Sequence, residues 1–154
     1  MSLAYLPGTV TQGGADAFAI ATVATALAGV TNVAYRVREL IYDFGRSPGV
    51  NASSLELSLT RRIKTAMPLI TDPDVLSKFR INAEFATSGL SHYESVIRLT
   101  FTEDDELLVV EDPLYFMIDS TLTALTQSAY CRIGYERVSI SALDRLSLLT
   151  QSLS

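Results

Sequence analysis

Apolar and polar residues alternate along most of the chain after residue 34, which is the pattern of half-buried β-strands. Leu55, Leu57 and Leu59 alternate with Ser, Glu and Thr, so that one face is apolar and the other polar. Further stretches of β character lie at 79–85, 93–101, 107–111, 114–119 and 129–140. The sequence therefore predicts a series of antiparallel strands, each with one face toward a core.

The stretch YRVRELIYDF (35–44) changes its apolar face in the middle. Its apolar positions are odd-numbered up to Val37 and even-numbered from Leu40 onward. One extra residue in a strand restores the apolar side to the core while the strand bends, so we expect a β-bulge near 38–39. The last strand changes phase in the same way around 136–137, and the same interpretation applies there.

The residue pattern predicts the secondary structure of residues 1–35 less directly. Residues 1–15 hold Pro7-Gly8 and Gly13-Gly14 and are expected to form an extended arm. In the Ala-rich segment that follows, the spacing of Ile20, Val23, Leu27 and Val30 favours a helix, although its Thr and Val content leaves a strand open. The uncharged run 17–35 has few large apolar residues, which favours a buried or interface segment over a membrane span.

Length and composition indicate one globular domain held together by packing. The chain has 154 residues, 48% of them hydrophobic, and its lone Cys131 excludes an intrachain disulfide. We expect a mainly β fold with short helices: an antiparallel curved sheet or sandwich of about seven to eight strands. Ser141 and Asp144 form a capping box that predicts a short C-terminal helix. The predicted organisation is an arm and Ala-rich segment at 1–33 and a single β-rich domain at 34–154.

The net charge of −5 is unevenly distributed along the chain. Residues 31–80 hold eight basic and five acidic residues, whereas residues 81–154 hold four basic and eleven acidic residues. This argues against a simple nucleic-acid-binding domain, which would be basic overall. It allows the basic part of one molecule to attract the acidic part of another.

Catalytic chemistry is poorly represented in the sequence. His92 is the only histidine; a two-imidazole metal site needs a second one, and a triad or a His–Cys dyad needs partners beyond this single group. Cys131 lies in strand phase with Ile133, which is typical of a buried structural cysteine. We therefore expect no enzyme activity, no catalytic residue and no small-molecule substrate.

A cluster of carboxylates is the one candidate for cation binding. Calcium takes six to eight oxygen ligands, so the acidic stretch is chemically suitable, but it lacks the spacing of a known calcium loop. A solvated hairpin tip is the simpler interpretation, and we expect no cofactor other than calcium. The candidate ligands are Glu103, Asp104, Asp105, Glu106, Glu111 and Asp112.

Basic residues on the predicted strands and loops form a candidate nucleic-acid contact. If these strands are neighbours, their polar faces can meet phosphates, although Glu39 and Glu56 occupy similar positions and suggest cross-strand ion pairs instead. The candidates are Arg36, Arg38, Arg61, Arg62, Lys64, Lys78 and Arg80.

Three parts of the chain resemble small viral and bacteriophage coat proteins. They are the arm GTVTQGGADAFAIATVATALAGV leading into VAYRVRELIYDF, the amphipathic strands from Leu55 to Ile140, and the closing helix SALDRLSLLTQSLS. The resemblance implies a subunit that assembles with copies of itself into a shell around a genome. In RNA-phage coats a sheet face holds RNA, and the pairs Arg36/Arg38 and Lys78/Arg80 occupy suitable positions. The chain departs from many genome-packaging coats because residues 1–35 hold no basic residue.

We therefore expect a virion structural protein that assembles in the host cytoplasm. Its partners would be copies of itself and viral nucleic acid, with no membrane association. The alternative is a monomeric or dimeric β-sandwich binding module that uses the acidic loop for a ligand or for calcium.

Overall fold

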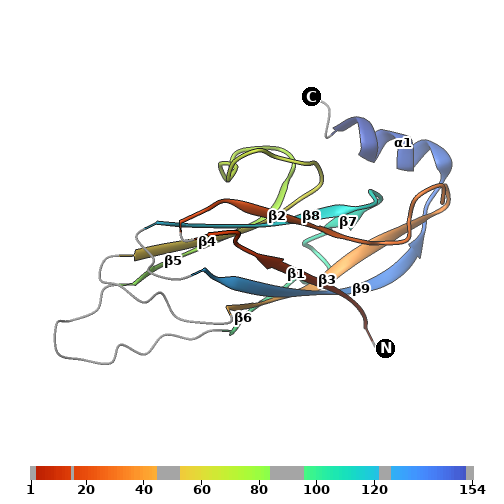
Figure 1. Ribbon diagram of the computed structural model, residues 1–154. Helices are drawn as coiled ribbons and strands as arrows, with labels where there is room; N and C mark the ends of the chain where they lie inside the picture. The colour runs from red at the N-terminus through yellow and green to blue at the C-terminus, as the bar shows by residue number, and fades with distance from the viewer. Residues whose placement is uncertain (1–2, 15, 45–52, 84–95, 122–125, 152–154) are drawn as a thin grey trace.

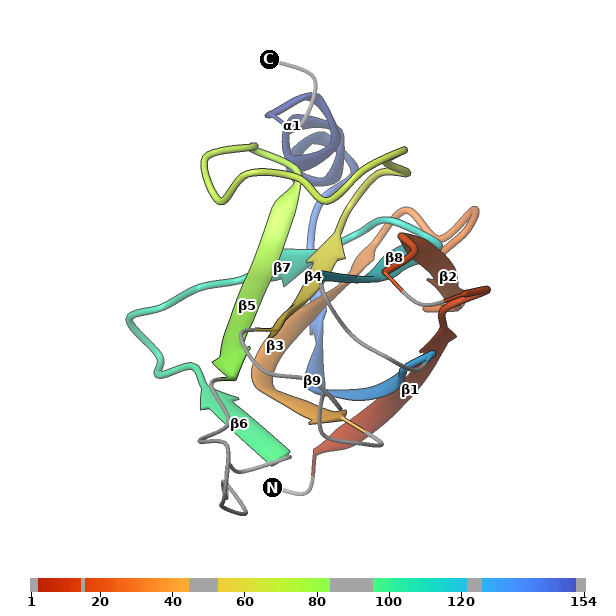
Figure 2. The ribbon, with the colours of Figure 1, turned by 60° about the vertical axis from the view of Figure 1, so that its left-hand side comes forward.

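The computed structural model of the protein describes residues 3–14, 16–44, 53–83, 96–121 and 126–151. These residues form β-strands and one α-helix, arranged in two layers (Figures 1 and 2). The elements are β1 (Ala4–Thr11), β2 (Ala19–Val23), β3 (Val33–Phe44), β4 (Ser53–Thr60), β5 (Val75–Ala83), β6 (Val96–Thr100), β7 (Leu108–Val109), β8 (Leu114–Thr121), β9 (Ser128–Ser139) and α1 (Ala142–Gln151). The predicted mainly β fold with a short C-terminal helix is confirmed.

The strands form two antiparallel sheets. One has the order β1-β9-β3-β6, with the short β7 also paired to β3, and the other has the order β2-β8-β4-β5. β6 pairs with residues 39–43 of β3 and β7 pairs with Tyr35 and Arg36, so β6 and β7 occupy successive parts of one edge. Counted as one edge strand, they give two four-stranded sheets between which the chain passes repeatedly. This is the order of a jelly-roll sandwich.

The core lies between the inner faces of the two sheets. Leu40 of β3 and Leu57 of β4 are fully buried there. The rings of Tyr42 on β3 and Phe116 on β8 stack across the layers with centroids 5.9 Å apart. Burial of these side chains is the main contribution to the stability of the sandwich.

The predicted bulge in β3 is confirmed. The pairing of β3 with β9 is regular up to Val37 and resumes at Glu39, so Arg38 is the extra residue. Val37 and Leu40 are consequently both buried, although they lie three positions apart and would face opposite sides of a regular strand. At the sheet edge occupied by β6 and β7, the Arg38 carbonyl accepts a 2.8 Å hydrogen bond from the Phe101 amide.

The phase change in β9 has a different cause from the one expected. The described pairings of β9 place the single register shift with β3 in β3 itself, opposite Gly134 and Tyr135. Val138 is paired with Ala34, which is fully buried outside the main core cluster, and Ile140 lines a groove with Leu148 of α1. The apolar residues at the end of β9 therefore face the side of the sheet that leads to the helix.

The helix predicted in the Ala-rich segment is wrong. Residues 19–23 form β2, an edge strand that pairs with β8, and the chain continues to β3 without a helix. Its partner strand and the burial of Val23 in the core explain the outcome, because tertiary pairing overrides a weak local preference. No helix among the described residues has the length and apolar character required to cross a membrane.

The N-terminal stretch is extended, as predicted, but it is paired within its own chain. All eight residues of β1 are in register with β9, from Ala4 opposite Tyr135 to Thr11 opposite Ser128. Val10 is 2% exposed and belongs to the core. With β1 and β2 added to the seven strands expected after residue 34, the described residues hold nine.

The loop between β4 and β5 (61–74) folds over the outer face of the second sheet. Ser58 and Met117 are paired across β4 and β8, alternate with core residues, and are nevertheless fully buried. On this side the Lys78 ammonium donates a 2.8 Å hydrogen bond to the Pro68 carbonyl of the loop. The loop ends in a tight turn, in which the Asp72 carboxylate accepts a 2.9 Å hydrogen bond from the Asp74 amide.

Candidate interaction surfaces

The seven basic residues predicted to contact nucleic acid fall into three separate groups. Arg36 and Arg38 lie on β3 in the first sheet, beside acidic residues from two other segments. Arg36 reaches Glu106 at 3.1 Å, and the Arg38 Nε atom is 3.1 Å from a Glu136 carboxylate oxygen. These two arginines are therefore part of ion pairs within the subunit.

The second group stands on the loop after β4. The Arg61 guanidinium holds both oxygens of Glu111, at 2.9 and 2.8 Å, and also donates to the Leu108 carbonyl. Both partners of this pair are largely buried, with side-chain exposures of 14% and 10%. The Arg61 Nη1 atom binds both carboxylate oxygens and Nη2 binds the Leu108 carbonyl, so these charge-assisted hydrogen bonds anchor the loop to the chain before β8.

The rest of this loop is also held by ion pairs. Lys64 lies 2.9 Å from Asp72 and 2.7 Å from Asp74, and Arg62 lies 3.6 Å from Asp74. The Lys64 ammonium and the Asp74 amide hold the pKa of Asp72 below its usual value. In turn, hydrogen bonds from Lys64 to Asp74 and Asp72 raise the lysine pKa. Arg61, Arg62 and Lys64 therefore neutralise carboxylates of their own subunit.

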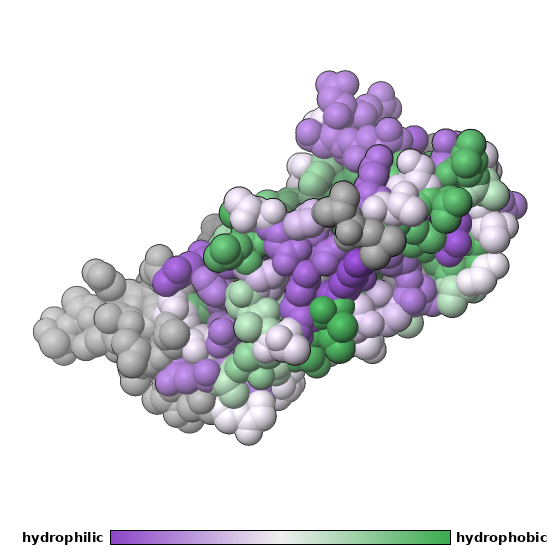
Figure 3. Space-filling model, turned by 90° about the horizontal axis from the view of Figure 1, so that it is seen from above, coloured by the Kyte–Doolittle hydropathy of each residue, from purple (hydrophilic) through white to green (hydrophobic). Residues whose placement is uncertain are grey.

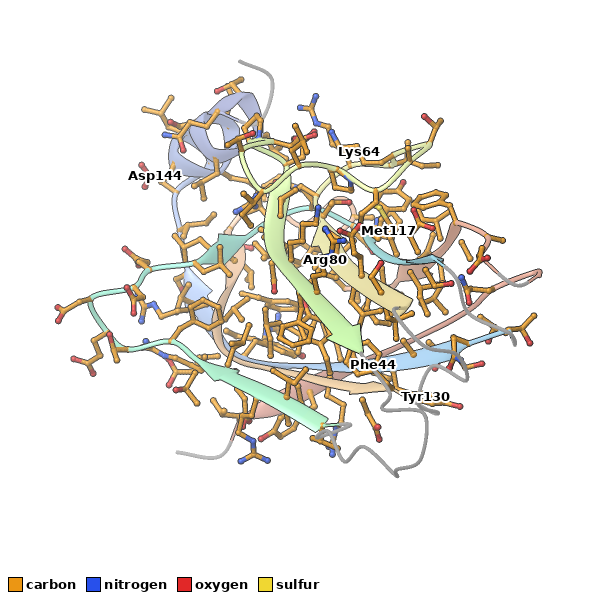
Figure 4. The ribbon with its side chains drawn as sticks, turned by 90° about the vertical axis from the view of Figure 1, so that its left-hand side faces the viewer. Phe44, Lys64, Arg80, Met117, Tyr130 and Asp144 are labelled. Atoms are coloured by element: carbon orange, nitrogen blue, oxygen red, sulfur yellow. The ribbon has the colours of Figure 1, made fainter. Side chains whose placement is uncertain are left out.

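The third group lies on β5, on the outer face of the second sheet. Lys78 and Arg80 approach the carboxylate of Glu56 at 3.8 and 3.6 Å, which is the cross-strand pairing considered from the sequence. Figure 4 shows Arg80 on β5 and Lys64 in the loop above it. The structure does not bring the seven basic residues into one patch.

The candidate calcium ligands are likewise dispersed. Glu103, Asp104 and Asp105 are exposed at the tip between β6 and β7, whereas Glu106 pairs with Arg36 and Glu111 with Arg61. No group of three or more potential metal ligands occurs within the described part of the chain.

Asp112 has a role in the fold that was not anticipated. Its carboxylate accepts hydrogen bonds from the backbone amides of Thr25 and Ala28, at 3.0 and 3.3 Å. The Thr25 amide is the main cause that lowers the pKa of Asp112. Tyr35 donates to the Thr25 carbonyl at 2.7 Å, so the loop between β2 and β3 is held from two sides.

A polar cluster on the outer face of the first sheet was missed by sequence reasoning. The Glu39 carboxylate is 7% exposed, accepts a 2.9 Å hydrogen bond from the Tyr5 hydroxyl and lies 2.9 Å from Arg98. This hydrogen bond raises the pKa of Tyr5. The Arg132 guanidinium lies 4.5 Å from the centre of the Tyr5 ring, a cation–π contact. Four strands contribute to the cluster, so it could be recognised only from their order in the sheet.

The single cysteine has the structural environment that was expected. Cys131 is 2% exposed on the inner face of β9, and burial raises the pKa of its thiol to about 12. A Cβ atom on Gly8 would lie 2.6 Å from its sulfur and 2.8 Å from Val23, so β1 can approach here only as glycine. His92 lies outside the described residues.

One end of the sandwich exposes large apolar side chains. Ile63, Leu69 and Ile70 on the loop between β4 and β5 are 66%, 72% and 66% exposed, and Leu143 and Leu146 on α1 are 76% and 57% exposed. The loop and α1 stand on the same side of the molecule, and Figure 3 looks onto this side, where apolar and polar side chains alternate. We call these five residues the end surface.

The helix α1 makes only limited contact with the sandwich. It begins with the predicted capping box, in which the Asp144 amide donates to the Ser141 hydroxyl oxygen at 3.0 Å. Its inner side is half-buried at Arg145, Leu148 and Leu149, and its described residues include no buried one. Arg145 and Leu149 line a groove of about 430 Å³ with Arg61 and Ile63.

Charged and apolar side chains are therefore distributed differently over the molecule. Most cations of β3 to β6 have carboxylate partners within the chain, whereas the five large apolar side chains of the end surface keep more than half of their area exposed.

Comparisons with known proteins identify a shared fold and no closer relationship. Neither a protein-family model nor a curated protein sequence matches the chain. Among solved structures, the crystal structure of tomato aspermy virus is similar, with a TM-score of 0.51 and 14% sequence identity over 88% of this chain and 78% of that one. The chain therefore has a viral coat-like fold.

Proposed function

We propose that this protein is a capsid subunit, and that its copies assemble into a closed shell around a viral genome. The observation that carries the proposal is the sheet order β1-β9-β3-β6 and β2-β8-β4-β5, a jelly roll of the kind that recurs in viral capsids. The fold shared with the tomato aspermy virus structure supports it. In this proposal the chain is a structural protein without catalytic function, assembled in the host cytoplasm and located in the virion.

Protein–protein contacts rather than genome charge would drive the assembly. The net charge is −5, and the candidate RNA contacts Arg36, Arg38, Lys78 and Arg80 each have a carboxylate neighbour. Paired cations offer less attraction to phosphate than free ones, since the carboxylate must first be displaced. Nucleic acid would then be a cargo of the shell and not its main source of stability.

Light scattering and negative-stain electron microscopy of the purified protein test the proposal. We expect uniform closed particles of many subunits, and we expect them to form after nuclease treatment as well. The ratio of absorbance at 260 and 280 nm, measured before and after that treatment, reports whether nucleic acid is enclosed. A persistent 16.8 kDa monomer at high protein concentration would refute the capsid role and would favour the binding-module alternative.

A further inference from the structure

We infer that the end surface is a two-fold contact with a second copy of this chain, centred on the outward side of α1. Leu143, Leu146 and Thr150 lie at helical spacing and are exposed, whereas Arg145, Leu148 and Leu149 on the other side are half-buried. This inference rests on the proposed function, because it specifies one of the contacts through which the subunits would assemble.

The helix needs a partner more than most helices do. It has only ten residues, and none of those described is buried in its own subunit. Helices of this length are marginal in water, because most of their stability comes from packing of an apolar face. The outward leucines supply that face, so a covering molecule would stabilise the helix as well as the contact.

The absence of charge on the outward side indicates what covers it. In a two-fold contact each residue near the axis meets its own copy, so a charge there would meet a like charge. The two charged residues of α1 are directed elsewhere: Asp144 accepts a hydrogen bond from the Ser141 hydroxyl at the helix start, and Arg145 lines the groove beneath the helix. A partner of a different kind is usually matched through complementary charges, which this side does not present.

The loop between β4 and β5 also has an uncharged segment beside its exposed apolar residues. Residues 65–71 (TAMPLIT) hold no charged residue, and the charged residues on either side pair with one another. The Arg61–Glu111 pair and the Lys64 contacts hold the loop in place. Leu69 and Ile70 are thus presented by a firmly held, uncharged segment, and Ile63 lies between Arg62 and Lys64, whose charges are paired with Asp72 and Asp74.

The area is sufficient for a dimer. Burial of one large apolar side chain removes roughly 60–120 Å² from water, so the five side chains of each copy give roughly 600–1,200 Å² for the pair, a range that includes the lower bound of about 1,000 Å² for a specific interface. Polar residues between them would form the hydrogen-bonding part of the contact, as in other interfaces of mixed composition.

The test uses opposite charges at one position of the full chain. Leu146→Glu and Leu146→Lys each place like charges at the two-fold axis, and each variant is expected to weaken dimer formation about 100-fold, as judged from the burial of two leucines. An equimolar mixture is expected to dimerise more tightly than either variant alone, because Glu then meets Lys and the like-charge repulsion is removed. Analytical ultracentrifugation of the subunit at concentrations below those of particle formation measures the dimer.

Tyr130→Glu provides the matched control. Tyr130 is 45% exposed on the outer face of the first sheet, far from Asp144 of α1 in Figure 4, so the substitution should leave the dimer unchanged. Circular dichroism and thermal unfolding verify that all variants fold. Because Leu146 is exposed in the subunit, we expect melting temperatures within a few degrees of the wild type.

The outcomes separate this contact from the capsid role. A dimer that is unaffected by both charged variants, or a mixture that dimerises no more tightly than either variant alone, would overturn the two-fold contact even if shells still form. A wild-type dimer that responds as described but never forms shells would support the contact and refute the capsid role. A wild-type protein that shows no dimer, or that needs a different protein to cover α1, would overturn the inference.

Discussion

At the scale of single residues, this protein uses most of its described charged side chains internally. Arg61 and Glu111 form an ion pair that is largely removed from water, and Glu39 binds both Arg98 and the Tyr5 hydroxyl. Buried pairs of this kind are costly to break, because the remaining charge has no solvent to stabilise it. Their importance can be measured one substitution at a time.

Replacement of Arg61 by alanine is expected to lower the free energy of unfolding by about 3–5 kcal/mol, since Glu111 would be left buried and unpaired. Urea denaturation measures the change. Arg80→Ala is the matched control: this side chain is 57% exposed and its contact with Glu56 is long, so its loss should cost at most about 1 kcal/mol. Equal effects of the two substitutions would mean that Arg61 is not an anchor of the loop.

Cys131 should make the protein less stable at alkaline pH. The thiol pKa is about 12 in the folded chain and about 9 when exposed, so above pH 9 the unfolded chain loses this proton while the folded chain retains it. Stability therefore falls as pH rises, by up to about 2 kcal/mol between pH 9 and 10.5. The variant Cys131→Ala should show a shallower decline over that range. Parallel declines would show that the thiol does not contribute.

At the scale of elements, the bulge in β3 allows a long strand to remain in register with the core. Arg38 is the inserted residue, and removing it would give regular alternation from Tyr35 to Phe44 with the apolar residues still inward. Removal of Ile41 instead would turn Tyr42 and Phe44 outward, because one residue reverses every following side chain.

Deletion of Arg38 should accordingly leave a folded protein that is less stable by about 1–3 kcal/mol, through loss of its hydrogen bonds and its pairing with Glu136. Deletion of Ile41 should prevent cooperative folding. Thermal unfolding followed by circular dichroism distinguishes the two variants. If both deletions unfold the protein, the bend itself is essential; if both are tolerated, the strand is not fixed in register.

Deletion of residues 1–11 should damage folding itself. The sequence suggested an extended arm, but β1 is paired with β9 along its whole length and places Val10 in the core. Loss of the cooperative unfolding transition is the expected result, and removal of only Met1 and Ser2 is the control. A truncated chain that melts like the full chain would show that β1 is dispensable for the subunit.

The strands that could be predicted are those whose own residues carry the information. The alternation of leucines identified β4, the change of phase identified the bulge near Arg38, and Ser141 with Asp144 identified the start of α1. The spacing of Ile20, Val23 and Leu27 favoured a helix for the residues that form β2. The pairing with β8 that stabilises this strand cannot be read from the local sequence.

Most of the polar surface escaped prediction for a related reason. Tyr5 and Glu39 meet across the sheet because β9 lies between β1 and β3, an arrangement that no local pattern specifies. The basic residues were identified individually, but their acidic partners come from segments up to about a hundred residues away, as with Arg38 and Glu136. Sequence spacing therefore suggested a patch where the fold produces separate ion pairs.

At the scale of the whole molecule, charged side chains and exposed apolar side chains have different roles. Ion pairs stabilise the subunit, and the end surface remains for a neighbour. This division predicts how association should depend on salt.

The dimer should be almost insensitive to salt. Between 0.1 and 0.5 M sodium chloride we expect its dissociation constant to change less than about threefold, since an uncharged contact is not screened. Sedimentation equilibrium over this range measures the constant. A loss of affinity of tenfold or more would indicate attraction between the basic and acidic parts of neighbouring chains instead.

The position of β9 between β1 and β3 sets the order in which a newly made chain can become complete. In chain order β9 follows every other strand of its sheet, and it fills the middle of that sheet, with α1 directly after it. A nascent polypeptide that has not yet reached residue 151 therefore lacks both the central strand and the outward leucines of the helix. Synthesis of residues 128–151 thus sets when the first sheet can close and when the apolar face of α1 appears.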